Sequence, residues 1–213
     1  MVQKTPDTAD TSGRRGRGRP RGFDTGQALN AAQASFWRAG YAATSLDTLA
    51  EATGLNRPSL YGAFGDKRAL YLAALAKSAD ESVASLAAAL AARPTVREAL
   101  ALVYDSAIRI YLAGERGPQG CFIIGTAVVE ALGDAAVREA LAGALTRMDG
   151  AFEARFAAAR SAGELPAEAD PRGLALIASA VLNNLAIRAR AGLDRATLQA
   201  VARAGVDALC GPA

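Results

Sequence analysis

The sequence predicts an all-α protein in which a short N-terminal three-helix unit precedes a longer helical body. Of the 213 residues, 51% are hydrophobic and only 6% aromatic, and the prominence of alanine and leucine is typical of helices. Glycine, proline and capping residues divide the chain into segments with a helical repeat, and none of these segments alternates like a strand. We therefore expect a flexible basic arm over residues 1–21, a compact helical domain over 22–66 and a larger helical domain over 67–213.

The N-terminal arm carries the excess of positive charge in a chain whose net charge is +3. Residues 14–22 read RRGRGRPRG, in which glycines separate the arginines and Pro20 prevents a helix. This segment resembles an AT-hook, and the resemblance implies that Arg17, Arg19 and Arg21 lie in the narrow minor groove of A·T-rich DNA. The alternatives are a solvated charged tail or a segment that binds an acidic membrane.

A first helix is expected over residues 25–39. Asp24 can open it with a capping box, and Gly40 ends it. We expect Trp37 and Tyr41 to close the edge of this unit by packing, and not by stacking on a base. Apolar side chains at helical spacing give the first three helices a common core: Leu29, Phe36, Leu46, Leu49, Leu55, Leu60 and Phe64.

Residues 40–67, GYAATSLDTLAEATGLNRPSLYGAFGDK, predict two short helices that share one corner. Ser45 can cap the first of them, which Gly54 ends in a left-handed conformation. Asn56 can cap the second, and Pro58 fits within its first turn because no intrahelical hydrogen bond is lost there. This pattern describes a helix-turn-helix, whose second helix would enter the DNA major groove. The alternative is an ordinary corner between two packed helices.

The run TSLDTLAEATGLNRPSLYGAFGDKRALY resembles the DNA-binding domain of TetR-family (TetR/AcrR-like) transcriptional regulators. In that family a Thr-Ser pair, an SLYxxF recognition helix and a following lysine recur together. The resemblance is close over the first third of the chain and extends to the remainder only in layout. It implies that residues 22–66 form a helix-turn-helix DNA-binding domain and residues 67–213 an effector-binding and dimerisation domain. The expected protein is a homodimeric repressor that binds a palindromic DNA operator and is released by a small-molecule effector. One departure is the pair Gly62-Ala63, where many relatives carry Tyr-His.

Several residues are expected to contact DNA. Arg57 is the best candidate for a base contact, because a guanidinium can pair bidentately with guanine N7 and O6. Thr44 and Ser45 can donate hydrogen bonds to phosphate, or they can serve only as caps. By resemblance, Tyr61 contacts a phosphate or a thymine methyl group, and Lys67 holds another phosphate. Apart from the arm, the full set is Thr44, Ser45, Arg57, Pro58, Ser59, Tyr61, Gly62 and Lys67.

Start and stop signals predict six further helices. Pro94 ends a long connector, Thr95 opens the next helix with a capping box, and Asp170-Pro171 is a strong start signal. The last two helices are apolar on more than one side and need a partner surface. The resemblance implies that they pair with their copies in a homodimer; the alternative is burial within one subunit. The expected ranges are 67–92, 95–113, 121–132, 134–162 and 171–191, with a last helix capped by Asp194.

A small molecule that shifts the connector helix would move the two recognition helices out of register with their half-sites. Pockets for such molecules combine apolar walls with a few hydroxyl or amide groups. The alternative for most of the candidates is plain core. The candidate lining is Tyr104, Ile108, Tyr111, Cys121, Phe122, Thr126, Val129, Phe152, Phe156 and Asn183.

Residue types argue against several function classes. The chain has no histidine and only two cysteines, Cys121 and Cys210, which disfavours hydrolytic and zinc chemistry. We find no catalytic triad, metal-ligand cluster or phosphate loop, so we expect no enzyme, no cofactor and no metal. With its apolar stretches interrupted and no signal-like segment, the chain is expected to be cytoplasmic.

Cys121 is either a redox sensor near a helix N-terminus or a buried small hydrophobic residue. The rival functions are a helical enzyme and an architectural DNA binder without an effector.

Overall fold

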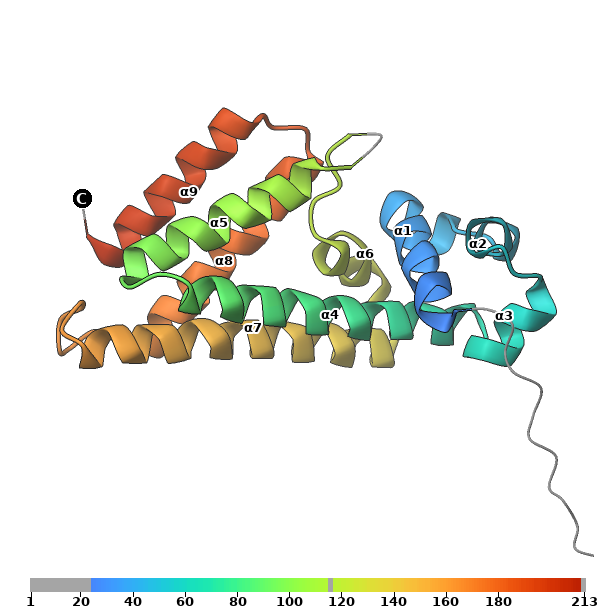
Figure 1. Ribbon diagram of the computed structural model, residues 1–213, viewed down its shortest axis with the longest axis horizontal. Coiled ribbons are helices and arrows are strands. Elements are labelled where there is room, and N and C mark those ends of the chain that lie inside the picture. The colour runs from blue at the N-terminus through green and yellow to red at the C-terminus, as the bar shows by residue number, and fades with distance from the viewer. Residues whose placement is uncertain (1–23, 115–116, 212–213) are drawn as a thin grey trace, which may run out of the picture.

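The computed structural model describes residues 24–114 and 117–211, which fold into nine α-helices without a strand (Figure 1). The all-α prediction is confirmed. Among the described residues no helix combines the length and apolar character that crossing a lipid bilayer requires. The helices are α1 (Thr25–Ala43), α2 (Leu46–Thr53), α3 (Arg57–Phe64), α4 (Lys67–Ala91), α5 (Val96–Leu112), α6 (Phe122–Glu130), α7 (Ala135–Ser161), α8 (Pro171–Arg190) and α9 (Arg195–Cys210).

Side-chain caps explain why the predicted ranges agree closely with these bounds. The Asp24 carboxylate accepts a hydrogen bond from the backbone N–H of Gly26 at 2.8 Å, and Thr95 opens α5 with the predicted capping box. Asp194 in turn accepts from the backbone N–H of Thr197 at 2.8 Å, one turn into α9. Such bonds satisfy the free N–H groups of a first turn. Gly40 has a φ of 81° and breaks α1, so the regular part of that helix ends at residue 39 as predicted.

The first core extends beyond the three N-terminal helices. Phe36, Leu49 and Leu60 are buried together with Tyr71 of α4 and Phe122 of α6. The rings of Phe36 and Tyr71 pack edge to face, with centroids 5.1 Å apart. The packing therefore does not change at residue 66, where we placed the end of the helix-turn-helix domain. The beginning of α4 belongs structurally to the first core.

The second core lies at the other end of the molecule. Helices α4 and α7 run side by side along the length of the molecule. Helices α5 and α8 pack over one end of that pair, and α9 packs on α5 and α8 (Figure 1). Since α4 has buried side chains in both cores, it connects the two ends as one continuous helix. The largest fully buried side chains of the second core are Tyr104, Leu100, Ile108, Phe152, Phe156, Leu185 and Leu198.

An ion pair fixes the start of α4 to the start of α7. Arg68 donates to both carboxylate oxygens of Asp134, the second bond being 2.7 Å long. Asp134 also accepts from the backbone N–H groups of Ala136 and Val137 as the cap of α7. The hydrogen bond from Arg68, aided by these two caps, holds the pKa of Asp134 well below its usual range.

A carboxylate with a lowered folded-state pKa stabilises the protein above its unfolded pKa of about 4 and loses that contribution as the pH falls. We therefore expect Asp134→Asn to lower the melting temperature at pH 7. The difference from the parent protein should shrink as the pH falls below about 4. Thermal unfolding followed by circular dichroism across this pH range measures the effect. Asp149→Asn on the same helix is the control, and an equal response in both variants would contradict the account.

Candidate DNA interface and ligand cavity

The predicted corner between α2 and α3 is present. The Ser45 hydroxyl accepts from the backbone N–H of Thr48 at 3.0 Å, and the Asn56 side chain accepts from the backbone N–H of Ser59 at 2.9 Å. Gly54 ends α2 with φ 67° and ψ 15°, a left-handed conformation that favours glycine. These caps place α3 at an angle to α2 with one face toward solvent.

The outward face of α3 carries most of the residues predicted to contact the major groove. Arg57, Pro58, Tyr61 and Gly62 are exposed, while Ser59 is half-buried. An exposed helix face with one guanidinium, one phenol and no bulk at Gly62 can approach a groove closely. The structure thus brings the α3 candidates onto one surface.

Lys67 lies at the edge of this face and is only half-buried. Its ammonium group sits 4.3 Å from the centre of the Tyr41 ring, a cation–π contact. Desolvation by the surrounding residues lowers the pKa of Lys67. This contact holds the ammonium group over the ring. Tyr41 itself packs against Tyr71, with ring centroids 4.8 Å apart, so its predicted packing role is confirmed.

Arg57 has a partner that the sequence analysis missed. Asp47 on α2 accepts from Arg57 Nε at 3.0 Å and from Nη2 at 2.7 Å. This hydrogen bonding raises the pKa of Arg57. The carboxylate thus engages Nε and, through both of its oxygens, Nη2, while Nη1 has no hydrogen-bond partner among the described residues. Nη1 can donate to a guanine acceptor directly, and a bidentate contact requires Nη2 to turn from Asp47 toward the base.

Thr44 does not fit its predicted place among the residues that contact DNA. Its side chain is fully buried, and its hydroxyl donates to the backbone carbonyl of Gly40 at 2.6 Å. Its backbone N–H donates to the carbonyl of Tyr41. Both donors are therefore used at the end of α1, and neither reaches the surface that would meet a phosphate. The capping alternative describes Thr44, whereas Ser45 is exposed and remains a candidate. The arm residues Arg17, Arg19 and Arg21 lie outside the described residues.

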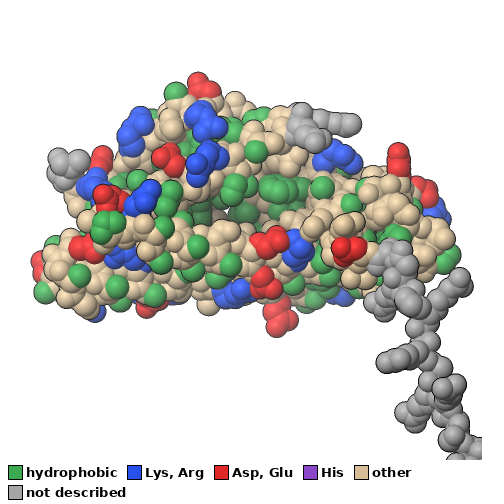
Figure 2. Space-filling model, in the orientation of Figure 1, with side chains coloured by type: hydrophobic (Ala, Val, Ile, Leu, Met, Phe, Trp, Pro, Cys, Tyr) green, Lys and Arg blue, Asp and Glu red, His purple; other side chains and the backbone are tan. Residues whose placement is uncertain are grey.

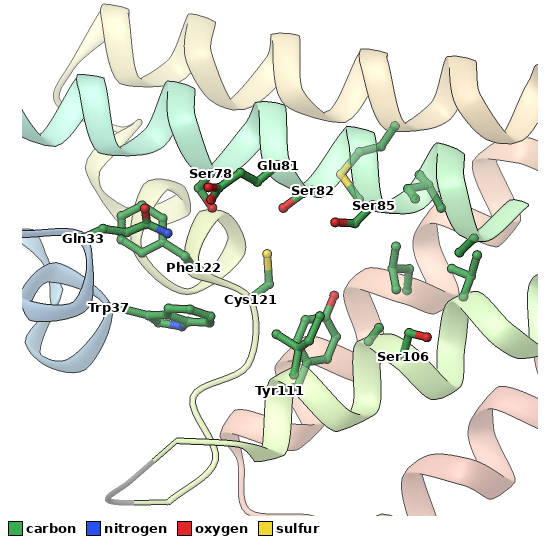
Figure 3. Close-up of a pocket in the computed structure, with 17 residues that line it drawn as sticks. Gln33, Trp37, Ser78, Glu81, Ser82, Ser85, Ser106, Tyr111, Cys121 and Phe122 are labelled. Atoms are coloured by element: carbon green, nitrogen blue, oxygen red, sulfur yellow. The ribbon is translucent and has the colours of Figure 1, made fainter. Parts of the chain in front are cut away.

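A cavity of about 260 Å³ lies between the two cores. Figure 2 shows hydrophobic side chains at the floor of a hollow between α4 and α5. In the close-up, the thiol of Cys121 and the hydroxyl of Tyr111 point across the cavity toward serines of α4 (Figure 3). The lining residues are Gln33 and Trp37 of α1; Ser78, Glu81, Ser82, Ser85, Leu86 and Ala89 of α4; Val103, Ser106, Ala107, Ile110 and Tyr111 of α5; Cys121 and Phe122; Met148; and Leu182.

Only Tyr111, Cys121 and Phe122 of the ten predicted pocket residues line this cavity. Tyr104 is buried in the second core, where its hydroxyl donates to the backbone carbonyl of Ala178 at 3.1 Å. Ile108, Phe152 and Phe156 are fully buried in the same core. For these residues the alternative stated above, that they are core residues, holds. Thr126 is buried and hydrogen-bonded to Tyr71, Val129 is exposed, and Asn183 is partly exposed but not in the lining. Placing these seven in a pocket was wrong.

Two groups of lining residues were missed. Ser78, Ser82 and Ser85 recur three and four residues apart and so share one face of α4; this polar stripe on a connector helix was a signal in the sequence. Gln33 and Trp37 of α1 were assigned to the DNA-binding unit alone. The Trp37 indole N–H donates to the carbonyl of Gln119 at 3.2 Å, so α1 contacts the loop before α6. No sequence pattern indicated that contact.

Cys121 lies at the N-cap position of α6, on the cavity wall. Desolvation raises the pKa of its thiol, and the backbone N–H groups of Ile124 and Ile123 oppose that shift only in part. A thiol with a raised pKa is a poor nucleophile at neutral pH. The chemistry of this site therefore favours the buried hydrophobic role over redox sensing.

In a Cys210→Ser background, Cys121 is the only thiol, and we expect iodoacetamide to alkylate it at least tenfold more slowly in the native protein at pH 7 than in the unfolded chain. The rate should rise with pH as the thiolate forms. Mass spectrometry of timed samples measures both rates. Equal rates in the folded and unfolded states would restore the sensor hypothesis.

Comparisons with known proteins agree with this architecture. A family model described as "Bacterial regulatory proteins, tetR family" matches residues 28–74, and one described as "Tetracyclin repressor-like, C-terminal domain" matches residues 97–205. The chain is 30% identical to the HTH-type transcriptional repressor ComR of Escherichia coli (strain K12), over 89% of this chain and 90% of that protein. It is 36% identical to the repressor BdcR of the same organism over 50% of this chain and 54% of that protein.

A solved structure of a cysteine mutant of the TetR-family regulator CifR contains double-stranded operator DNA of 26 base pairs. That chain is 31% identical to this one, with a TM-score of 0.77 over 89% of this chain and 99% of that chain. A TetR-family regulator from Cytophaga hutchinsonii, 26% identical, gives the same TM-score over 87% of this chain and 92% of its own. The chain therefore belongs to the TetR family of bacterial regulatory proteins and is a sequence-specific DNA-binding regulator of transcription.

Proposed function

We propose that this protein is a homodimeric repressor that binds a palindromic operator in the bacterial cytoplasm and is released by a small molecule in the cavity between α1, α4, α5 and α6. The observation that carries the proposal is that this cavity has walls from both the DNA-binding unit and the helical body. The named repressors ComR and BdcR support the direction of regulation. The proposal assigns the chain no catalytic activity.

The proposed DNA contacts come from α3 and its surroundings. Arg57 reads a guanine, Ser59 and Tyr61 face the same groove, and Lys67 and Ser45 contact phosphates. Pro58 and Gly62 add no side-chain hydrogen-bond donor, but their small size allows α3 to approach the bases closely. The arm residues Arg17, Arg19 and Arg21 enter an adjacent minor groove. Two copies related by a two-fold axis then bind two half-sites.

The proposed dimer surface is the outer face of α8 and α9. Three large apolar side chains of α8, Leu176, Ile177 and Ile187, are about half exposed, at 47%, 52% and 56%. On α9 the exposed Ala200 and Ala204 lie four residues apart, and small side chains allow helices to approach closely. Side chains of this kind, exposed along one helix in a monomer, support burial against a second copy.

Release requires the effector to bind the DNA-incompetent state more tightly than the DNA-binding state. A ligand with equal affinity for both states does not shift the equilibrium between them. The continuous helix α4 begins beside the recognition helix and carries Ser78, Ser82 and Ser85 of the cavity wall. A ligand that spreads α4 from α5 would therefore displace the start of α4 together with α3. Both recognition helices then leave the spacing of their half-sites.

Transcription in vitro tests the proposed direction of regulation. A promoter that overlaps an operator selected from genomic fragments is transcribed with and without the protein. We expect the transcript to decrease about tenfold or more once the operator is saturated. A promoter with a scrambled operator is the control. An increase in transcript, or an equal effect on both templates, would contradict repression.

A further inference from the structure

The lining of the cavity defines the kind of ligand that fits it. Its volume of about 260 Å³ lies just below the roughly 300–1,000 Å³ typical of pockets for drug-sized ligands. Trp37, Phe122, Leu86 and Met148 supply apolar and aromatic surface. The ligand should therefore be compact and largely apolar.

The charges of the walls argue against an ionic ligand. Among the described residues, Glu81 is the only charged residue that lines the cavity. It forms an ion pair with Lys77, one turn earlier on α4. No Lys or Arg side chain of the described chain faces the space, so an anion would lose its hydration without compensation. A cation would have to compete with Lys77 for the single carboxylate. The walls therefore suit a neutral molecule.

One polar group of the cavity lacks a partner. The side-chain oxygen of Gln33 is shielded from solvent and has no hydrogen-bond partner among the described residues. Leaving a buried polar atom unpaired is unfavourable. Because this oxygen is closed off from the cavity, the Gln33 side chain has to turn toward the cavity before a ligand can supply the missing bond. Figure 3 shows Gln33 at the end of the cavity nearest α1, the helix that also carries Trp37 one turn later. A hydroxyl group, which both donates and accepts, satisfies this amide in either orientation.

We infer that the cavity binds a compact neutral alcohol or phenol whose hydroxyl hydrogen-bonds Gln33, so that α1 senses the ligand directly. This inference rests on the proposed function, in which the cavity is the effector site, and adds the chemical class of the ligand. Helix α1 carries Phe36 in the core shared with α2 and α3. The bond to Gln33 therefore links the ligand to the DNA-binding unit without α4 as an intermediate.

Trp37 makes binding observable, because it is the only tryptophan of the chain and lies in the cavity wall. Cyclohexylmethanol is a suitable neutral probe, and cyclohexanecarboxylate is its anionic counterpart; neither absorbs where tryptophan is excited. We expect cyclohexylmethanol to change Trp37 emission saturably and the carboxylate to leave it unchanged at the same concentrations. Gln33→Leu should weaken alcohol binding at least about fivefold, the effect of one lost hydrogen bond.

Gln27→Leu, an exposed position on the same helix, is the matched control and should bind the alcohol like the parent protein. Gln33→Leu should melt no lower than the parent, since it removes an unpaired buried atom. No saturable response to the alcohol, equal binding of the carboxylate, or unchanged affinity in Gln33→Leu would each overturn the inference. Operator affinity is measured on the same samples. If the alcohol binds through Gln33 but leaves that affinity unchanged, the ligand site stands and the proposed release mechanism fails.

Discussion

Replacing Arg57 by alanine is expected to weaken binding of the dimer to its operator by roughly 2–6 kcal/mol, that is, about 1–3 kcal/mol for one bidentate base contact in each of two protomers. The side chain is exposed on α3 and contributes nothing to either core, so the fold should be unaffected. Fluorescence anisotropy with a labelled operator measures the loss. Arg93→Ala removes an exposed arginine of the turn before α5 and should have no effect. Equal losses on operator and scrambled DNA would instead assign Arg57 to phosphate.

Asp47 should determine how selective Arg57 is. With Asp47→Ala the guanidinium loses the partner that occupies Nε and Nη2, and the protein surface beside the phosphates loses a negative charge. We expect affinity for scrambled DNA to rise and the ratio of operator to scrambled affinity to fall several-fold. Binding to both duplexes at one fixed salt concentration gives this ratio. An unchanged ratio would show that Asp47 does not orient Arg57.

A charge on the outer face of α8 is expected to have the largest effect on operator binding. Ile177→Asp would bury a carboxylate in the proposed dimer interface, which is strongly unfavourable without a partner. We expect a monomer in sedimentation experiments and an operator affinity near that of non-specific binding, at least about a thousandfold weaker. Leu132→Asp changes an exposed apolar residue after α6 and should leave the dimer intact. A dimer that survives Ile177→Asp but not Leu132→Asp would place the interface elsewhere.

The local signals of the sequence were sufficient for the helices and for the exposed face of α3. Asp24, Ser45, Asn56, Thr95 and Asp194 each cap the helix that they were predicted to begin. Such caps depend on hydrogen bonds within about three residues, so one sequence contains all the information needed. Residues on one face of a short helix, such as Arg57 and Tyr61, follow from the same local geometry.

The cavity could not be predicted in the same way, because its walls come from six helices and the segment before α6. Tyr104 and Phe156 have the residue types of a ligand pocket but pack inward, and periodicity alone does not separate core from cavity lining. Gln33 lies on a helix assigned to DNA binding, 88 positions before Cys121, which lines the same cavity. The Asp47–Arg57 pair likewise depends on the angle between two helices. Thr44 was misassigned because a buried cap and a phosphate ligand use the same residue type.

The most direct test of sequence-specific DNA binding compares a DNA fragment from upstream of the protein's own coding region with a scrambled duplex. Fluorescence anisotropy would be recorded at two salt concentrations for the intact chain and for a chain lacking residues 1–21. We expect the upstream fragment to bind about a thousandfold or more tightly, with the truncation reporting how much affinity the arm adds. If both duplexes bound equally and binding disappeared with added salt, the arm would be acting only as a polycation. That result would contradict recognition of this fragment by α3.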